Sequence, residues 1–337
     1  MMFIFHVITT IFFIGAHSGE LRGFINPLNS KSIDLFLVVD ERSTYSSILD
    51  FGLFKTTLKS MFSDLNPSGS SPYFGAYFFG ATSSVQISVP FRTQTADAAK
   101  ALIDIKQYPF LQSNPSTLST ALALVESDCS LYCRAGVPRV TIIFSGAPQF
   151  SNKPAILQLE NNRGMTVMFV GIGSNASELL VNELASYPKQ YYGVRVQSMH
   201  ELTILSQHIS SIASDVPRLI STNQPISISF TSPNVYYTVQ LNLLPYTTQV
   251  DKIIMVASNC PQCRVYGSVL QPNPIFENTP EIAIGQPFYT AAGYPNTIFY
   301  FRVPKDTARF YLSIRSNGMN DLKLVLDTFQ LPTMLTA

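Results

Sequence analysis

The sequence predicts an α/β domain, built on a doubly wound and mainly parallel sheet, followed by an all-β antiparallel sandwich. Two observations predict this order. From about residue 33 to 215, short apolar runs alternate with stretches of helical spacing, which indicates parallel strands joined by helices. From 225 to 330 the helical period disappears, and apolar residues alternate with polar ones between proline- and glycine-containing turns. That second pattern is typical of antiparallel strands.

Six apolar runs are the expected strands of the first domain. Most are apolar throughout, as expected of strands that are covered by helices on both faces. They are 33–39, 74–79, 85–90, 140–144, 166–170 and 191–196. The short segment Gly-Ala-Thr-Ser-Ser separates the second run from the third, and this spacing predicts a hairpin that adds one antiparallel strand.

Helical spacing fills the intervals between these runs. Apolar residues recur three and four positions apart in 46–62, and 117–127 and 153–162 follow the same pattern. The last helix has the clearest start, because Ser198 and Glu201 form a capping-box signature. We place the first domain at 30–215 and a linker at 216–224. The sandwich follows at 225–330.

The N-terminal segment and the charge balance indicate a secreted chain. Residues 1–18 are mostly apolar and end in Ala16 and Ser18, which suits a signal peptide cleaved before Gly19; a membrane anchor is the alternative. No later segment has eighteen consecutive apolar residues, so we expect no membrane span in the mature chain. The 22 basic and 21 acidic residues nearly balance, which argues against a nucleic-acid partner.

Cysteines and one glycosylation motif agree with an extracellular location. The spacings Cys129–Cys133 and Cys260–Cys263 would also suit a zinc site, but the two pairs lie in different predicted domains. In an oxidising compartment we therefore expect two local disulfides. Asn175, in Asn-Ala-Ser, is the expected glycan acceptor, in a predicted loop.

Four segments of the first half carry a family resemblance: IDLFLVVDERST, STLSTALAL, PRVTIIFSGAPQF and MTVMFVGIGS. In this order they resemble a von Willebrand factor type A domain over roughly 180 residues, a full domain of typical size. The resemblance implies a metal-ion-dependent adhesion site at the carboxyl ends of the strands. There, Asp-x-Ser-x-Ser follows the first strand, a threonine precedes the third helix, and a Thr-Asp-Gly triplet follows the fourth strand. Such oxygen ligands suit Mg²⁺.

Most of these positions differ in this sequence. Asp40 matches the first aspartate, but Arg42 stands at the next ligand position, and a guanidinium offers only donors. Thr44 and Ser116 match the remaining hydroxyl positions. The second aspartate is absent, because the fourth strand runs into Ser145-Gly146-Ala147.

We therefore expect a degenerate site at Asp40, Thr44 and Ser116, in which Arg42 pairs with Asp40 and no cofactor binds. Bound Mg²⁺ is the alternative. Because open α/β sheets bind ligands at the carboxyl ends of their strands, a metal-free binding face at this edge is the functional alternative. Its candidate residues are Arg42, Ser43, Thr44, Ser116, Thr117 and Ser145.

The end of the chain has a second resemblance. The stretch NTIFYFRVPKDTARFYLSIRSNGMNDLKLVLDT resembles the end of the prepeptidase C-terminal domains found beside secreted peptidases. Its turn contains Asn317, Asn320 and Asp321, which would form an oxygen-rich site for Ca²⁺. A solvated hairpin turn is the alternative interpretation.

No catalytic constellation emerges from the sequence. His200 and His208 lie eight residues apart on the last predicted helix, and nucleophile-elbow, zinc-protease and phosphate-loop motifs are missing. We expect a non-enzymatic protein that mediates extracellular protein–protein interaction or adhesion. The alternative is a carbohydrate-binding or hydrolase-accessory protein that uses the sandwich. Exposed aromatics among Tyr236, Tyr237, Tyr289, Tyr294 and Tyr300 would favour that alternative, whereas the lack of tryptophan in the chain weakens it slightly.

Overall fold

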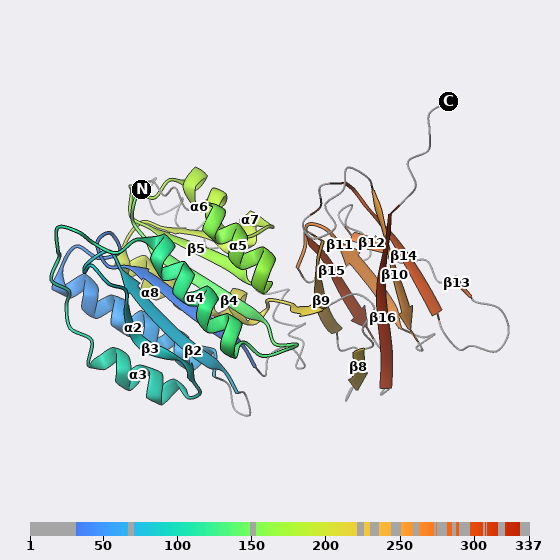
Figure 1. Cartoon of the computed structure of the whole chain (residues 1–337), viewed down its shortest axis with the longest axis horizontal. Helices are drawn as coiled ribbons and strands as arrows, with labels where there is room; N and C mark the ends of the chain where they lie inside the picture. Colours follow the sequence, from blue (N-terminus) through green and yellow to red (C-terminus); the bar gives the residue numbers. More distant parts are fainter. Residues whose placement is uncertain are drawn as a thin grey trace, which may run out of the picture.

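The computed structural model shows two domains, each with its own hydrophobic core (Figure 1). It describes residues 32–66, 71–148, 153–220, 226–229, 236–243, 251–258, 263–272, 274, 282–284, 288–289, 297–305, 307, 309–315 and 321–330. The predicted signal peptide, 1–18, lies outside these residues. No helix within the ranges just given is long and apolar enough to cross a membrane.

The first domain is built on a six-stranded sheet with the order β3-β2-β1-β4-β5-β6. All neighbouring strands are parallel except β2 and β3, which form the predicted antiparallel hairpin. The strands are β1 Asp34–Asp40, β2 Tyr73–Phe79, β3 Gln86–Thr93, β4 Arg139–Ser145, β5 Thr166–Ile172 and β6 Gly193–Val196. Every residue of β1 and β5 is buried, which explains why these strands are apolar without alternation.

Helices cover both faces of this sheet (Figure 1). α2 packs against α3 and α8, while α4 packs against α5 on the other side. Their bounds are α2 Ile48–Asp64, α3 Ala96–Asp104, α4 Leu118–Tyr132, α5 Lys153–Arg163, α6 Glu178–Leu184, α7 Lys189–Tyr192 and α8 Met199–Ser214. The doubly wound α/β prediction is confirmed.

Hydroxyl side chains start most of these helices. The N-cap residues of α2, α3, α4, α6 and α8 each accept a hydrogen bond from a backbone N–H in the first turn, which satisfies a donor that the helix leaves unpaired. At α8, Ser198 accepts from the Glu201 N–H at 3.2 Å as predicted. The Glu201 carboxylate instead accepts from the N–H of Gln197, one residue earlier than in a standard capping box.

The second domain contains two sheets, with the orders β13-β14-β10-β16-β8 and β12-β11-β15-β9-β7. Its strands are β7 Arg218–Ile220, β8 Ile226–Ser229, β9 Tyr236–Asn242, β10 Lys252–Ser258, β11 Arg264–Ser268, β12 Ile282–Ile284, β13 Phe288–Tyr289, β14 Thr297–Val303, β15 Arg309–Arg315 and β16 Asp321–Gln330. Neighbours pair antiparallel except β7 and β9. The antiparallel prediction for this half is confirmed.

The start of the predicted linker is part of the fold. Residues 218–220 form β7, which pairs in parallel with β9 of the second domain. The preceding Val216 belongs to the core of the first domain, and the Pro217 carbonyl accepts from Gln240 Nε2 at 2.9 Å. The sequence suggested a separate connection here, because a three-residue strand with a partner far along the chain has no local signal.

A buried arginine joins the two domains. Arg309 of β15 is 5% exposed and its partner Glu160 of α5 is 8% exposed. The guanidinium donates to the Met165 carbonyl at 2.6 Å, to Thr166 Oγ1 at 3.1 Å, and to Glu160 Oε1 at 3.4 Å. Burial alone would lower the pKa of Arg309, but Glu160 and the nearby tyrosines raise it above its ordinary value. Arg309 is therefore a charged side chain of the second domain that is buried against the first domain and bonded to its acceptors.

Two further contacts hold this joint. Tyr311 of β15 donates its hydroxyl to the Tyr187 carbonyl at 2.7 Å. Leu219 of β7 packs on Gly164, where a Cβ would lie 1.9 Å from the leucine Cδ2 and where φ is +61°. Glycine is required at 164 both for this close approach and for the left-handed backbone.

The predicted cysteine pairing is confirmed in one loop. Cys129 and Cys133 form a disulfide that ties the last turn of α4 to its C-cap. Cys263 is also disulfide-bonded, whereas Cys260 lies outside the described residues. Asn175 is exposed, in a turn just before α6.

Replacing the buried arginine will weaken the joint. Arg309→Met leaves Glu160 buried without its cation, and such a loss costs about 3–5 kcal/mol in the free energy of unfolding. Urea unfolding monitored by fluorescence would measure it. Arg302→Met is the control, since the Arg302–Asp251 pair is on the surface and exposed pairs contribute little. Equal losses in the two variants would contradict a special role for Arg309.

The pH dependence of stability will carry a contribution from Asp215. Burial at the end of α8 raises the pKa of its carboxyl to about 6. A folded-state pKa above the unfolded value means that the native state binds the proton more tightly, so this group adds stability as the pH falls. Between about pH 7 and pH 4, the gain is on the order of 3 kcal/mol.

Urea unfolding of the wild type and Asp215→Asn over this pH range would measure the difference. Carboxyls whose pKa is lowered, such as Asp104 and Asp251, reduce the free energy of unfolding as the pH falls. Their contribution is the same in the wild type and in Asp215→Asn, so it cancels in the difference. Parallel curves for the two proteins would refute the contribution of Asp215.

Candidate functional site

The candidate site lies where β1 and β4 end. Asp40 is the last residue of β1 and Ser145 is the last residue of β4. Since these strands are adjacent and parallel, their carboxyl ends meet at one edge of the sheet. Ser43, in the turn after β1, completes the group. In open α/β sheets this edge is the usual place for a ligand.

Two hydroxyls saturate one oxygen of the Asp40 carboxylate. Oδ2 accepts from Ser43 Oγ at 2.5 Å and from Ser145 Oγ at 2.8 Å. Each hydroxyl in turn accepts a backbone N–H, from Gly146 at 2.9 Å and from Ala147 at 3.1 Å respectively. With their lone pairs engaged in this way, both hydroxyls direct their protons to the carboxylate. The buried charge is thereby satisfied within the chain.

The predicted pairing of Arg42 with Asp40 is wrong at the level of side chains. The Arg42 backbone N–H donates to Asp40 Oδ1 at 3.1 Å, but its guanidinium turns away and donates to the Gln112 carbonyl at 3.1 Å. Ser43, one residue later in the sequence, fills the space beside the carboxylate. The turn after β1 thus shifts the bonding hydroxyl by one position from the family pattern.

The other predicted residues divide into buried and accessible ones. Thr44 is buried and its hydroxyl donates to the Phe144 carbonyl at 3.1 Å. Ser116 is also buried, and accepts from the Gly80 N–H at 3.4 Å. Thr117 is exposed and caps α4. Among the six candidates for the binding face, Arg42, Ser43 and Thr117 reach the surface, whereas Thr44, Ser116 and Ser145 do not.

The arrangement does not fit a divalent cation. Gly146 stands where the family pattern has its second aspartate, and a Cβ there would lie 2.3 Å from the Ser43 carbonyl oxygen and 2.8 Å from that of Ile172. Backbone therefore occupies the space that a second carboxylate would need. Mg²⁺ requires near-octahedral oxygen ligands, but the single carboxylate is already hydrogen-bonded and the Thr44 hydroxyl points into the sheet. The described part of the chain also contains no cluster of three or more His, Cys, Asp or Glu.

An apolar segment beside the site was missed by the sequence reasoning. Residues 105–111 follow α3 and expose several large side chains, as do the first residues of α2. The exposed side chains are Ile48, Leu49, Ile105, Tyr108, Phe110 and Leu111. Tyr108 packs edge-on against Phe51 of α2 with ring centroids 5.6 Å apart. The available signal was an apolar run, Tyr-Pro-Phe-Leu, that fits neither the helical nor the strand period.

Other candidates are spread over both domains. His200 is exposed and His208 is half-buried, both on α8. Tyr237 is buried and Tyr300 is exposed, while Tyr236 and Tyr289 lie in β9 and β13. Like Cys260, the candidates Tyr294, Asn317 and Asn320 lie outside the described residues. Asp321, the third residue of the proposed Ca²⁺ turn, begins β16.

Comparison with known proteins identifies the first domain. The family model for the von Willebrand factor type A domain matches residues 34–208. Comparison with curated proteins gave no match.

Several solved structures are similar to this chain. Proximal thread matrix protein 1 from the mussel byssus matches with 15% identity and a TM-score of 0.46, over 60% of this chain and 51% of that one. The same protein with a zinc-occupied MIDAS motif matches with 16% identity and a TM-score of 0.46, over 60% and 51%. BatB from Bacteroides thetaiotaomicron matches with 15% identity and a TM-score of 0.39, over 54% and 98%. The chain thus spans about half the length of the mussel protein.

Restoring the second carboxylate will not restore a metal site. In Gly146→Asp the new side chain meets the backbone of Ser43, and overpacking of this kind costs about 1–3 kcal/mol in the free energy of unfolding. We expect no heat of Mg²⁺, Mn²⁺ or Ca²⁺ binding in calorimetric titrations of chelator-treated wild type, Asp40→Ala or Gly146→Asp.

Gly52→Asp is the control for stability, because a Cβ at Gly52 meets nothing within 4 Å. Metal binding by the wild type that Asp40→Ala abolishes would contradict the closed arrangement. So would a stable, metal-binding Gly146→Asp.

Proposed function

Because the chain belongs to the von Willebrand factor type A domain family through residues 34–208, we propose that it is a secreted, non-enzymatic binding or adhesion protein. It engages an extracellular protein through the carboxyl edge of its sheet. No metal ion bridges the two proteins. Domains of this family suggest roles in protein–protein interaction and adhesion, which is the general basis of the proposal.

The observation that carries the metal-free mode is the closed Asp40 site. A bridging ion needs free oxygen ligands on the domain and one open position for the partner. Here Asp40 Oδ2 accepts from the hydroxyls of Ser43 and Ser145, and the backbone of Ser43 closes the second carboxylate position. Partner binding at this edge must then depend on the side chains that reach the surface.

Those side chains have the composition of a protein interface. Arg42 and Thr117 are exposed and Ser43 is half-buried, and Ile48 and Leu49 are exposed at the start of α2, in the same connection after β1. Arginine together with apolar side chains is typical of the residues that dominate binding energy. The exposed hydroxyl of Thr117 adds a hydrogen bond that would fix orientation.

The hydrogen bonding of the two serines supports a non-enzymatic role. A nucleophilic serine needs a base that is free to take its proton, but here one oxygen of the Asp40 carboxylate is shared by Ser43 and Ser145, which also accept from backbone amides. Both hydroxyls serve to hold the carboxylate.

Three features support secretion. The Cys129–Cys133 disulfide is typical of an oxidising compartment. The apolar segment 1–18 suits a signal peptide. Asn175 is exposed where a glycan would be tolerated.

An adhesion assay with the full chain would test the proposal. Beads coated with the protein would be washed over immobilised extracellular matrix, in Mg²⁺ and in chelator. We expect equal retention in both solutions. Arg42→Glu should lower retention about tenfold, because it reverses the charge of a central interface arginine.

Arg264→Glu is the matched control, since Arg264 is exposed on β11 of the second domain. Loss of retention in chelator would overturn the metal-free mode. Equal retention by the Arg42 and Arg264 variants would overturn the proposed binding edge, and no retention of the wild type would overturn adhesion to matrix.

A further inference from the structure

The segment after α3 exposes more apolar surface than a solvated loop requires. Phe110 is 84% exposed and Ile105 is 75% exposed. Leu111 and Tyr108 beside them, and Ile87 on the edge strand β3, are also exposed. Contiguous apolar surface of this kind on a soluble protein marks an interaction site.

Hydrogen bonds fix the shape of this segment. At its start, Lys55 Nζ donates to the carbonyls of Asp104 at 2.7 Å and Lys106 at 3.0 Å. At its end, the Gln112 N–H donates to the Ala81 carbonyl at 2.7 Å and its side chain accepts from the Ser83 N–H at 2.9 Å. The backbone between these anchors is therefore held in place, and a partner need not pay the entropy of ordering it.

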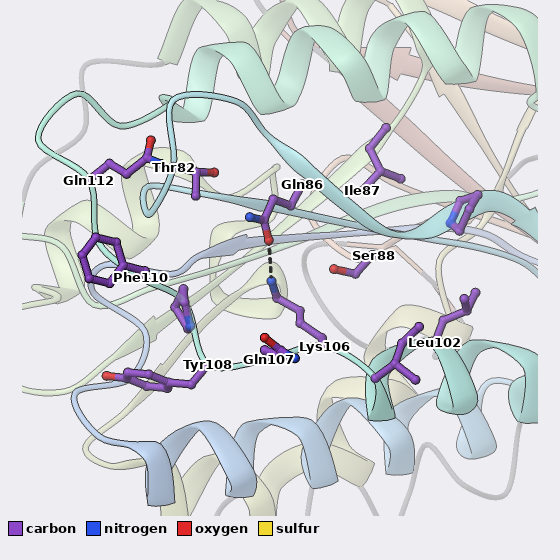
Figure 2. Close-up of a pocket in the computed structure, with 13 residues that line it drawn as sticks. Thr82, Gln86, Ile87, Ser88, Leu102, Lys106, Gln107, Tyr108, Phe110 and Gln112 are labelled. Atoms are coloured by element: carbon purple, nitrogen blue, oxygen red, sulfur yellow. Dashed lines mark hydrogen bonds between the residues drawn. The ribbon is translucent and has the colours of Figure 1, made fainter.

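A hollow lies next to the projecting side chains. It has a volume of about 670 Å³ between β3 and α3, within the range of clefts that accept a ligand. Figure 2 shows Phe110 and Tyr108 at one end of the hollow and Ile87 and Leu102 at the other. One face of the molecule thus carries both a projection and a recess.

We propose that this face binds a second copy of the chain, and that Phe110 of each copy enters the hollow of the other. An isologous contact uses the same patch on both partners, so the patch must be complementary to itself. A projection adjacent to a recess of suitable size meets this requirement. A patch made only of projections would not.

The charges around the face are also self-complementary. Its rim on α2 and α3 carries both signs, in the pair Lys59–Asp104 between the two helices and the pair Lys100–Asp97 on α3. Within the hollow, Lys106 is neutralised by the buried carboxylate of Glu41 at 2.7 Å. A patch with charges of a single sign would repel the same patch on a second copy. A patch with both signs allows positive side chains of one copy to face negative side chains of the other. The formal net charge of +1 adds no long-range repulsion between copies.

Sedimentation velocity of the full chain, from about 1 to about 100 μM, would test the contact, since interfaces of ordinary size reach at least micromolar affinity. We expect a concentration-dependent dimer. Phe110→Ser should raise its dissociation constant about 30-fold, as for a buried aromatic at the centre of an interface.

A matched pair of variants locates the contact. Ile105→Ser removes an isoleucine of the proposed face, and Ile204→Ser removes one on α8 that is 66% exposed. The first should weaken the dimer and the second should leave it unchanged. Thermal unfolding would confirm that all variants fold, as expected for exposed positions.

Three results would overturn the proposal. A wild type that is monomeric over the whole concentration range would show that this face does not bind a second copy of the chain. A dimer that persists in both Phe110→Ser and Ile105→Ser would lie elsewhere on the molecule. Equal weakening by Ile105→Ser and Ile204→Ser would mean that general surface hydrophobicity drives association.

Discussion

A carboxylate at the end of a buried central strand must find donors, and this requirement shapes the whole carboxyl edge of the vWA domain. Asp40 takes its donors from Ser43 and Ser145. To bring Ser43 into place, the turn after β1 closes against Gly146, where any side chain would meet its backbone. Arg42 is consequently turned outward to the Gln112 carbonyl. The hydrogen bonds that the Asp40 carboxylate needs thus determine that Ser43 turns inward and Arg42 turns outward at this edge.

At the contact between the domains, a buried positive charge likewise requires hydrogen-bond partners. Arg309 is buried and needs acceptors, which the first domain supplies from Glu160, Met165 and Thr166. Because Arg309 and Glu160 belong to different domains, their ion pair forms only when the two domains are in contact. The second domain is therefore packed against the first domain, and the two are not independent units joined only by a linker.

Local patterns in the sequence predicted much of the fold and little of the detailed chemistry. The apolar runs of β1, β4 and β5 and the spacing of α2 and α8 are local signals, and they located these elements. The strand β7 was missed because it depends on pairing with the distant strand β9. The short helix α3 was missed although its N-cap Thr95 and the spacing of Ala96, Ala99 and Ile103 are local signals. At the site, the family pattern identified Asp40 and the lost second aspartate. It could not show that Ser43 replaces Arg42 beside the carboxylate, since the course of a turn depends on Ser145 and Gly146, about a hundred residues away.

The parallel pairing of β7 with β9 has a mechanical consequence. The chain leaves α8 and enters β7 with only a few residues between, so a pull between a partner held at the carboxyl edge and the second domain is transmitted through this strand. Since β7 lies alongside β9 in register from Arg218 to Ile220, tension along it loads these pairings together, in shear, instead of one after another. The connection between the domains is thereby suited to resist a pulling force.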